Sequence, residues 1–140
     1  MTGRTAIFAS ALAIAFGLGW GIELCNAEEA APKDNKGFSA SKTTTVDLGQ
    51  EIDGMNGRQL RLRVLTIKPG GHIGIHSHKD RPAVVYFLQG TDTVSLADGT
   101  SKTFHPGETS SATKGTTHWH RNDGQDDVVL IAVDVFHLSN

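Results

Sequence analysis

Cysteine is nearly absent from this chain, whose 140 residues include only Cys25. A single cysteine excludes an internal disulfide and a zinc site built on paired cysteines. Proline is also scarce, at four residues, and aromatic residues make up only 6% of the chain. No charge predominates, since 13 Lys and Arg stand against 15 Asp and Glu. We therefore expect no nucleic-acid partner, because such partners require a basic surface.

The N-terminus carries the one long apolar run. Residues 5–22 (TAIFASALAIAFGLGWGI) contain no charged side chain, follow Arg4, and precede the stretch CNA at 25–27. A basic start, an apolar run and small residues before a cut are typical of a secretory signal peptide. We predict a signal peptide over residues 1–27, cleaved after Ala27, and a periplasmic or secreted protein. The run is also long enough to remain as an uncleaved anchor, whereas cleavage leaves no stable membrane insertion.

A polar stretch follows the signal segment. Residues 28–42 (EEAAPKDNKGFSASK) are mostly small or charged and show no hydrophobic period. A segment without such a period has no face to bury, so we expect a flexible linker over 28–42. The folded domain is then expected over residues 43–140.

The pattern of residues 43–140 predicts an all-β domain. Aliphatic and polar residues alternate over 59–64 (QLRLRV), which predicts a strand with its aliphatic side chains buried and its arginines exposed. The apolar run 83–88 predicts a strand covered on both faces, and the β-branched run 128–138 predicts a long central strand. A turn signal within 91–104 predicts a hairpin. Short strands separated by glycine-rich turns predict a sandwich or a barrel.

Histidine is the unusual component of the composition, at seven residues. His76 and His78 are two residues apart, and His118 and His120 repeat that spacing. Side chains two apart on a strand point to the same face, so each pair can bring both imidazoles to one metal ion. Two antiparallel strands lining one cavity would bring the pairs together. The other histidines are expected at a loop or barrel mouth (His72), in a turn (His105) and in the last strand (His137).

The spacing around these histidines resembles that of the cupin family. The first cupin motif is G-x5-H-x-H followed by three or four residues, a glutamate, six residues and a glycine. The second is G-x5-P-x-G-x2-H-x3-N. The match spans residues 70–122. The matching residues are Gly70, His76, His78 and Gly90 in the first motif, and Gly107, Gly115, His118 and Asn122 in the second.

The resemblance implies a jelly-roll β-barrel, or double-stranded β-helix, with one metal ion inside. It assigns metal binding to His76, His78 and His118, and it suggests a homodimer. Two positions depart from the motifs, since Ala83 stands in place of the glutamate and Thr113 in place of the proline. Proline at that position only rigidifies a turn. The change at Ala83 removes the carboxylate ligand and leaves neutral imidazoles.

A site of three histidines resembles the cupins that use iron in thiol and diketone dioxygenation. The resemblance therefore implies an oxidoreductase of the dioxygenase type that acts on a small-molecule substrate. Fe(II) is the favoured ion, although imidazole ligands also suit Zn, Cu and Ni, and Mn remains an alternative. One alternative function is a non-enzymatic module that binds a small ligand or a metal. Another is a metal-assisted isomerase or lyase, in which His120 or Tyr86 would move a proton.

Several further residues have more than one interpretation. His120 is a metal ligand, a support for a ligand, a substrate contact or a packed side chain. Asp80 would be a replacement carboxylate, but the turn sequence KDRP favours a solvated loop charge. Arg81 either reaches an anionic substrate or faces water. Tyr86 and Trp119 would line the cavity, yet aromatic residues in a barrel more often belong to the core.

Overall fold

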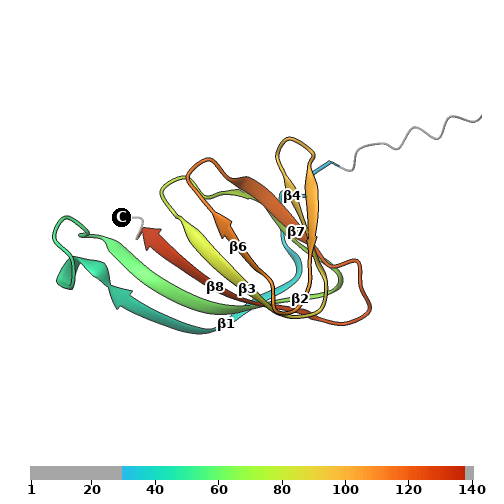
Figure 1. Ribbon diagram of the computed structural model, residues 1–140, viewed down its shortest axis with the longest axis horizontal. Coiled ribbons are helices and arrows are strands. Elements are labelled where there is room, and N and C mark those ends of the chain that lie inside the picture. Colours follow the sequence, from blue (N-terminus) through green and yellow to red (C-terminus); the bar gives the residue numbers. More distant parts are fainter. Residues whose placement is uncertain (1–29, 138–140) are drawn as a thin grey trace, which may run out of the picture.

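The computed structural model describes residues 30–137, which form an all-β chain (Figure 1). The predicted signal peptide and its cleavage site lie outside the described residues. In the described part, no helix is long and apolar enough to cross a membrane. One short 3-10 helix, η1 (Leu48–Gln50), follows the first strand. The strands are β1 (Lys36–Asp47), β2 (Arg58–Ser77), β3 (Ala83–Gln89), β4 (Asp92–Leu96), β5 (Ser101–Phe104), β6 (Thr109–Ala112), β7 (Thr117–Arg121) and β8 (Val128–His137).

The strands form one antiparallel sheet in the order β5-β4-β7-β2-β8-β3-β6, and β1 pairs with β2. Strand β2 belongs to two walls of this sheet. Its first part pairs with β8 over Arg58–Ile67, and its last part pairs with β7 over His72–Ser77. In Figure 1 the strands β4 and β7 face β3, β6 and β8 across the molecule. The sheet thus curves into a nearly closed barrel, and strands form within the predicted ranges 83–88, 91–104 and 128–137. The expectation that 83–88 is covered on both faces is wrong, because Val84 and Tyr86 are 56% and 42% exposed on its outer face.

The hydrophobic core lies between the two walls. Inward positions alternate along β8, where Val128, Leu130 and Ala132 are buried. The rings of Phe87 and Phe104 stack with their centroids 4.4 Å apart. Burying a side chain of this size stabilises the fold by about 1.5–3 kcal/mol. The core therefore packs β8 and β3 against the short β4–β5 hairpin, which belongs to the opposite wall of the barrel.

The prediction of which face of 59–64 is buried is wrong. Leu60 and Leu62 are 41% and 38% exposed, whereas the side chains of Arg61 and Arg63 are only 14% and 19% exposed. The reason is Asp134 on the neighbouring strand β8, which is 2% exposed and accepts hydrogen bonds from both guanidinium groups. Because a buried carboxylate compensates the arginines, they can occupy the inner face. Hydropathy alone gives the opposite assignment.

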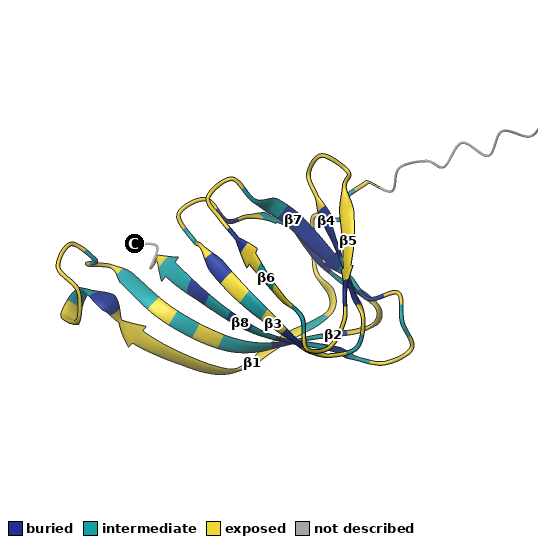
Figure 2. Ribbon diagram, viewed as in Figure 1, coloured by how far each residue is buried: buried dark blue, intermediate teal, exposed yellow. Residues whose placement is uncertain are grey.

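The expectation of a flexible linker over 28–42 is also wrong for its second half. Strand β1 begins at Lys36 and pairs with β2 along its length. Its side chains are almost all exposed (Figure 2). The strand therefore has no buried face, and its sequence shows no hydrophobic period. Backbone hydrogen bonds to β2 hold it in place instead. The residues before it are also attached, since the Pro32 carbonyl accepts from the Ile75 amide at 2.7 Å.

Candidate metal centre

A bulge in β2 turns the side chain of His76 toward His118 and His120 of β7. Ile73 pairs with His120 and His76 pairs with His118, so three steps along β2 match two along β7. Without the extra residue, Ile73 and His76 would lie on opposite faces. The bulge contains Gly74, where a Cβ atom would lie 2.6 Å from the carbonyl oxygen of Asp34. The glycine-rich stretch before the histidines therefore creates the register that the site requires.

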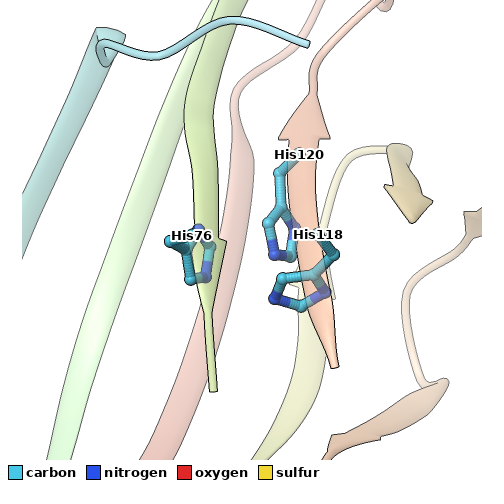
Figure 3. A group of neighbouring side chains, drawn as sticks. All are labelled: His76, His118 and His120. Atoms are coloured by element: carbon cyan, nitrogen blue, oxygen red, sulfur yellow. The ribbon is translucent and has the colours of Figure 1, made fainter. Parts of the chain in front are cut away.

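Histidines from both strands meet inside the barrel. Ring nitrogens of His76, His118 and His120 all lie within 4.8 Å of one another, and Figure 3 shows the three side chains converging from β2 and β7. His78 follows directly after β2, and its Nε2 lies 3.1 Å from Nε2 of His118. Two nitrogen ligands at about 2.1 Å from one ion and at right angles are about 3.0 Å apart. The spacing of the imidazoles thus fits ligands of a single metal ion.

Backbone carbonyls orient two of these rings. Nδ1 of His76 donates to the carbonyl of Gly74 at 2.9 Å, and Nδ1 of His78 donates to the carbonyl of Arg81 at 2.8 Å. A carbonyl oxygen only accepts, so each ring carries its proton on Nδ1. Each Nε2 then has a free lone pair, as a metal ligand requires.

A buried carboxylate orients a third ring. Nδ1 of His120 donates to Oδ2 of Asp92 at 2.6 Å, and Asp92 is 1% exposed. Metal-binding histidines typically donate their second N–H to such a partner, which also makes the ligating nitrogen more basic. Asp92 lies in neither of the two histidine motifs. Its place in β4, two residues before the buried Val94, is the signal that would have shown an inward carboxylate.

Burial favours the neutral form of three imidazoles, those of His76, His78 and His118. Desolvation lowers the pKa of His76 to about 4 and the pKa of His118 to about 2. Desolvation also lowers the pKa of His78, with the positive charge of Arg81 as a further cause. Neutral imidazole is the form that binds metal ions. These side chains therefore remain competent to bind a metal at and below neutral pH.

The histidines line a cavity of about 300 Å³ whose other lining residues include small side chains. Ala83 and Ala112 are cross-strand partners on β3 and β6, and Ala132 lies on β8. Ala83, the position of the missing motif glutamate, therefore lines the same cavity as the imidazoles. Its methyl group leaves open the space that a carboxylate side chain would fill. The donor set fits a divalent ion held by imidazoles, with room beside it for a small molecule.

Other predicted site residues lie elsewhere. Tyr86 is 42% exposed and does not line this cavity, because it has the outward parity of Val84 on β3. Trp119 is buried, but it has the opposite parity to its histidine neighbours on β7 and lines a different surface hollow with Ala30. Asp80 is exposed in a turn with φ of 59°, as a solvated loop charge would be. The remaining histidines, His72, His105 and His137, lie outside the cluster.

The family model described as a cupin domain matches residues 63–134, more than half of the chain. The chain belongs to the cupin family. Its fold is similar to that of the polyketide cyclase RemF from Streptomyces resistomycificus, with a TM-score of 0.58 and 21% identity over 74% of this chain and 68% of that one. No curated protein sequence matches this cupin closely enough to count as a relative.

Two further solved structures share the cupin fold. A predicted oxalate decarboxylase from Thermotoga maritima gives a TM-score of 0.55 and 17% identity over 78% of this chain and 96% of that one. An oxalate oxidase in complex with glycolate gives a TM-score of 0.51 and 21% identity over 70% of this chain. The present cupin spans 50% of the length of that oxidase.

The structure also brings together a group of ring nitrogens that the family motif does not name. The motif assigns His76, His78 and His118, whereas the group of three nitrogens within 4.8 Å of one another contains His120 in place of His78. His78 remains in contact through His118. His120 lies two residues after His118 on β7, so its side chain points to the same face and joins the group.

Asp92→Asn should weaken metal binding by about 10–100-fold, the range typical for partners that orient a ligand. Asparagine keeps the shape of the side chain but removes the negative charge beside Nδ1 of His120. Titration with a divalent ion, followed by calorimetry, measures the effect. Asp127→Asn is the matched control, since Asp127 pairs with Lys68 on the surface. Equal metal affinity in both variants would remove Asp92 from the site.

Stability of the metal-free protein should fall as the pH drops from about 6.5 toward 4. The folded-state pKa of His76 lies at about 4, below the unfolded value of 6.5, so the unfolded chain takes up the proton first. The stability that neutral His76 contributes to the fold is fully present above about pH 6.5. It is lost as the pH falls toward the folded-state pKa of about 4. Thermal melts across this range test it. The loss should be smaller in His76→Gln but unchanged in His105→Gln, which alters an exposed histidine. A dependence that is the same in both variants contradicts the assignment.

Proposed function

We propose that this cupin is an exported metal-dependent oxidoreductase of the dioxygenase type, acting on a small metabolite with Fe(II) as the favoured ion. The observation that carries the proposal is an imidazole-only ligand set beside an open cavity. Ala83 stands where the family motif has a carboxylate, so space remains next to the ion. Imidazole ligands with open positions suit iron that reacts with oxygen.

The side chains divide into distinct roles in this proposal. His76, His118 and His120 hold the ion, and His78 completes the set from the loop after β2. A bound iron ion would supply the oxidative chemistry. The protein holds the imidazoles in one tautomer and provides a cavity in which the substrate is positioned.

The isomerase or lyase alternative has less support. It requires His120 or Tyr86 to move a proton, but His120 lies among the imidazoles that would hold the ion and Tyr86 does not line the cavity. The non-enzymatic alternative is a module that binds a small ligand. Oxygen uptake distinguishes it from an enzyme.

The test combines metal content with oxygen uptake. Protein purified without chelators is expected to contain one divalent ion per chain and to consume oxygen with at least one member of a small-metabolite panel after iron loading. His118→Ala should lose both properties. A metabolite that binds without any oxygen uptake would support the binding module instead. Metal-free protein after purification and after loading would contradict the proposal.

Export is tested separately. The sequence predicts that the mature chain begins at Glu28, because the small residues at 25–27 precede the proposed cut. Mass spectrometry of the protein recovered from its native host measures the N-terminus. A cytoplasmic protein that retains Met1 would contradict export.

A further inference from the structure

The cavity beside the histidines has more positive than negative charge. Among the described residues, its lining includes the cationic side chains of Lys33, Arg63 and Arg81 and only one carboxylate, that of Asp134. The balance of the lining is therefore cationic before any metal is bound.

Three guanidinium groups share the single carboxylate. Arg61 forms a fork with Asp134, with Nε at 3.0 Å from Oδ1 and Nη2 at 2.8 Å from Oδ2. The same Oδ2 also accepts from Nη2 of Arg63 at 3.2 Å and from Nη1 of Arg81 at 3.4 Å. The fork with Arg61 has the geometry of a strong pair, whereas the other two contacts are longer than such pairs usually are. Arg63 and Arg81 thus retain charge and donors that Asp134 does not satisfy.

Arg63 shows this directly. Its Nε is buried and has no hydrogen-bond partner among residues 30–137. A buried donor without a partner is unfavourable and rare in folded proteins. The pKa of Arg63 is lowered, chiefly by desolvation and also by repulsion from Arg61 and Arg81. An anion in the cavity would supply both the missing acceptor and the missing negative charge.

We propose that the cavity binds a small organic carboxylate, whose carboxylate group is received by Arg63 and Arg81. A planar carboxylate matches the fork of a guanidinium group. The apolar remainder of the molecule would lie against Ala83, Val85 and Ala112, which line the same cavity of about 300 Å³. The proposal rests on the proposed function, since it names the substrate class of the same site. The side chain of Arg81 acts at the carboxylate while its carbonyl oxygen holds His78, so one loop residue joins ligand binding to the histidines.

Benzoate and benzamide test the proposal, because they share size and shape but only benzoate is anionic. The full chain, freed of metal and titrated by calorimetry at low salt, should bind benzoate at least tenfold more tightly than benzamide. Arg81→Gln should remove most of this preference. Lys68→Gln is the matched control, since it removes an exposed cation that pairs with Asp127 on the surface. Equal affinity for the two probes, or a preference that survives Arg81→Gln, overturns the proposal.

A second variant covers the case in which Arg81→Gln does not fold. Asp134→Asn removes the carboxylate that competes with the ligand, so benzoate should bind this variant more tightly than the parent and raise its melting temperature by more. Inorganic phosphate is the third probe, and binding of phosphate without binding of benzoate overturns the assignment to carboxylates. Metal stoichiometry is measured on the same parent protein. Benzoate selectivity without metal binding contradicts only the proposed function, and metal binding without benzoate selectivity contradicts only the substrate class.

Discussion

His118→Ala should lower the metal affinity by more than about 100-fold, beyond the loss expected for a partner that only orients a ligand. His118 lies at the centre of the cluster. Its ring centroid is 4.7 Å from that of His76, 4.9 Å from that of His78 and 4.7 Å from that of His120. Metal content after equilibration with one divalent ion, measured by atomic emission, gives the result. His105→Ala is the control, since His105 is exposed and outside the cluster.

The same measurement on His78→Ala and His120→Ala tests the ligand that the family motif assigns and the ligand that the structure adds. The motif assigns a ligand at His78, and the group of three nitrogens within 4.8 Å of one another contains His120. We expect both variants to lose affinity, because His78 lies 3.1 Å from His118 and His120 is held by Asp92. Unchanged metal content in His118→Ala would show that the ion, if bound, lies elsewhere.

Ala83→Glu should increase the stabilisation that a hard or borderline ion such as Mn²⁺ provides. Ala83 is buried and lines the cavity with the imidazoles, so a carboxylate there would reach toward the ion. Oxygen-dependent activity should fall, because the new ligand occupies the space beside the metal. The larger side chain also costs about 1–3 kcal/mol through overpacking.

Ala83→Gln is the matched control for that variant, because it adds the same volume without the charge. Thermal melts of both variants and the parent, with and without Mn²⁺, separate the steric cost from the ligand effect. The account predicts a larger metal-induced shift in the Glu variant than in the Gln variant or the parent. Equal shifts in all three would show that position 83 does not face the ion.

Much of the fold is predictable because local patterns agree with tertiary structure. The apolar runs at 83–88 and 128–137 lie in β3 and β8, and the turn signal within 91–104 gives the β4–β5 hairpin. These segments are covered by neighbours on the inner face, so hydropathy reports their structure. Strand β1 was missed because its side chains are exposed and only its backbone hydrogen bonds keep it in the sheet.

The histidine cluster was predictable because it follows from spacing along the sequence. Features that depend on contacts between residues far apart in the sequence were not. The repeated His-x-His spacing predicted a cluster across two strands, and His76 does pair with His118. The bulge at Gly74 depends on a chain segment that packs against it, which spacing does not show. The inward position of Arg61 and Arg63 depends on Asp134, which lies about 70 residues away in sequence. The pairing of Asp92 with His120 likewise joins two strands, although the inward parity of Asp92 with Val94 is visible in the sequence.

One measurement tests the central claim most directly: anomalous X-ray scattering at the cobalt absorption edge from crystals of the Co²⁺-loaded protein. The account predicts one peak per chain inside the barrel, about 2.1 Å from Nε2 of His118 and within bonding distance of His76 and His120. A peak held by other residues, or no peak in the cavity at saturating Co²⁺, would contradict the claim that these histidines form a metal centre.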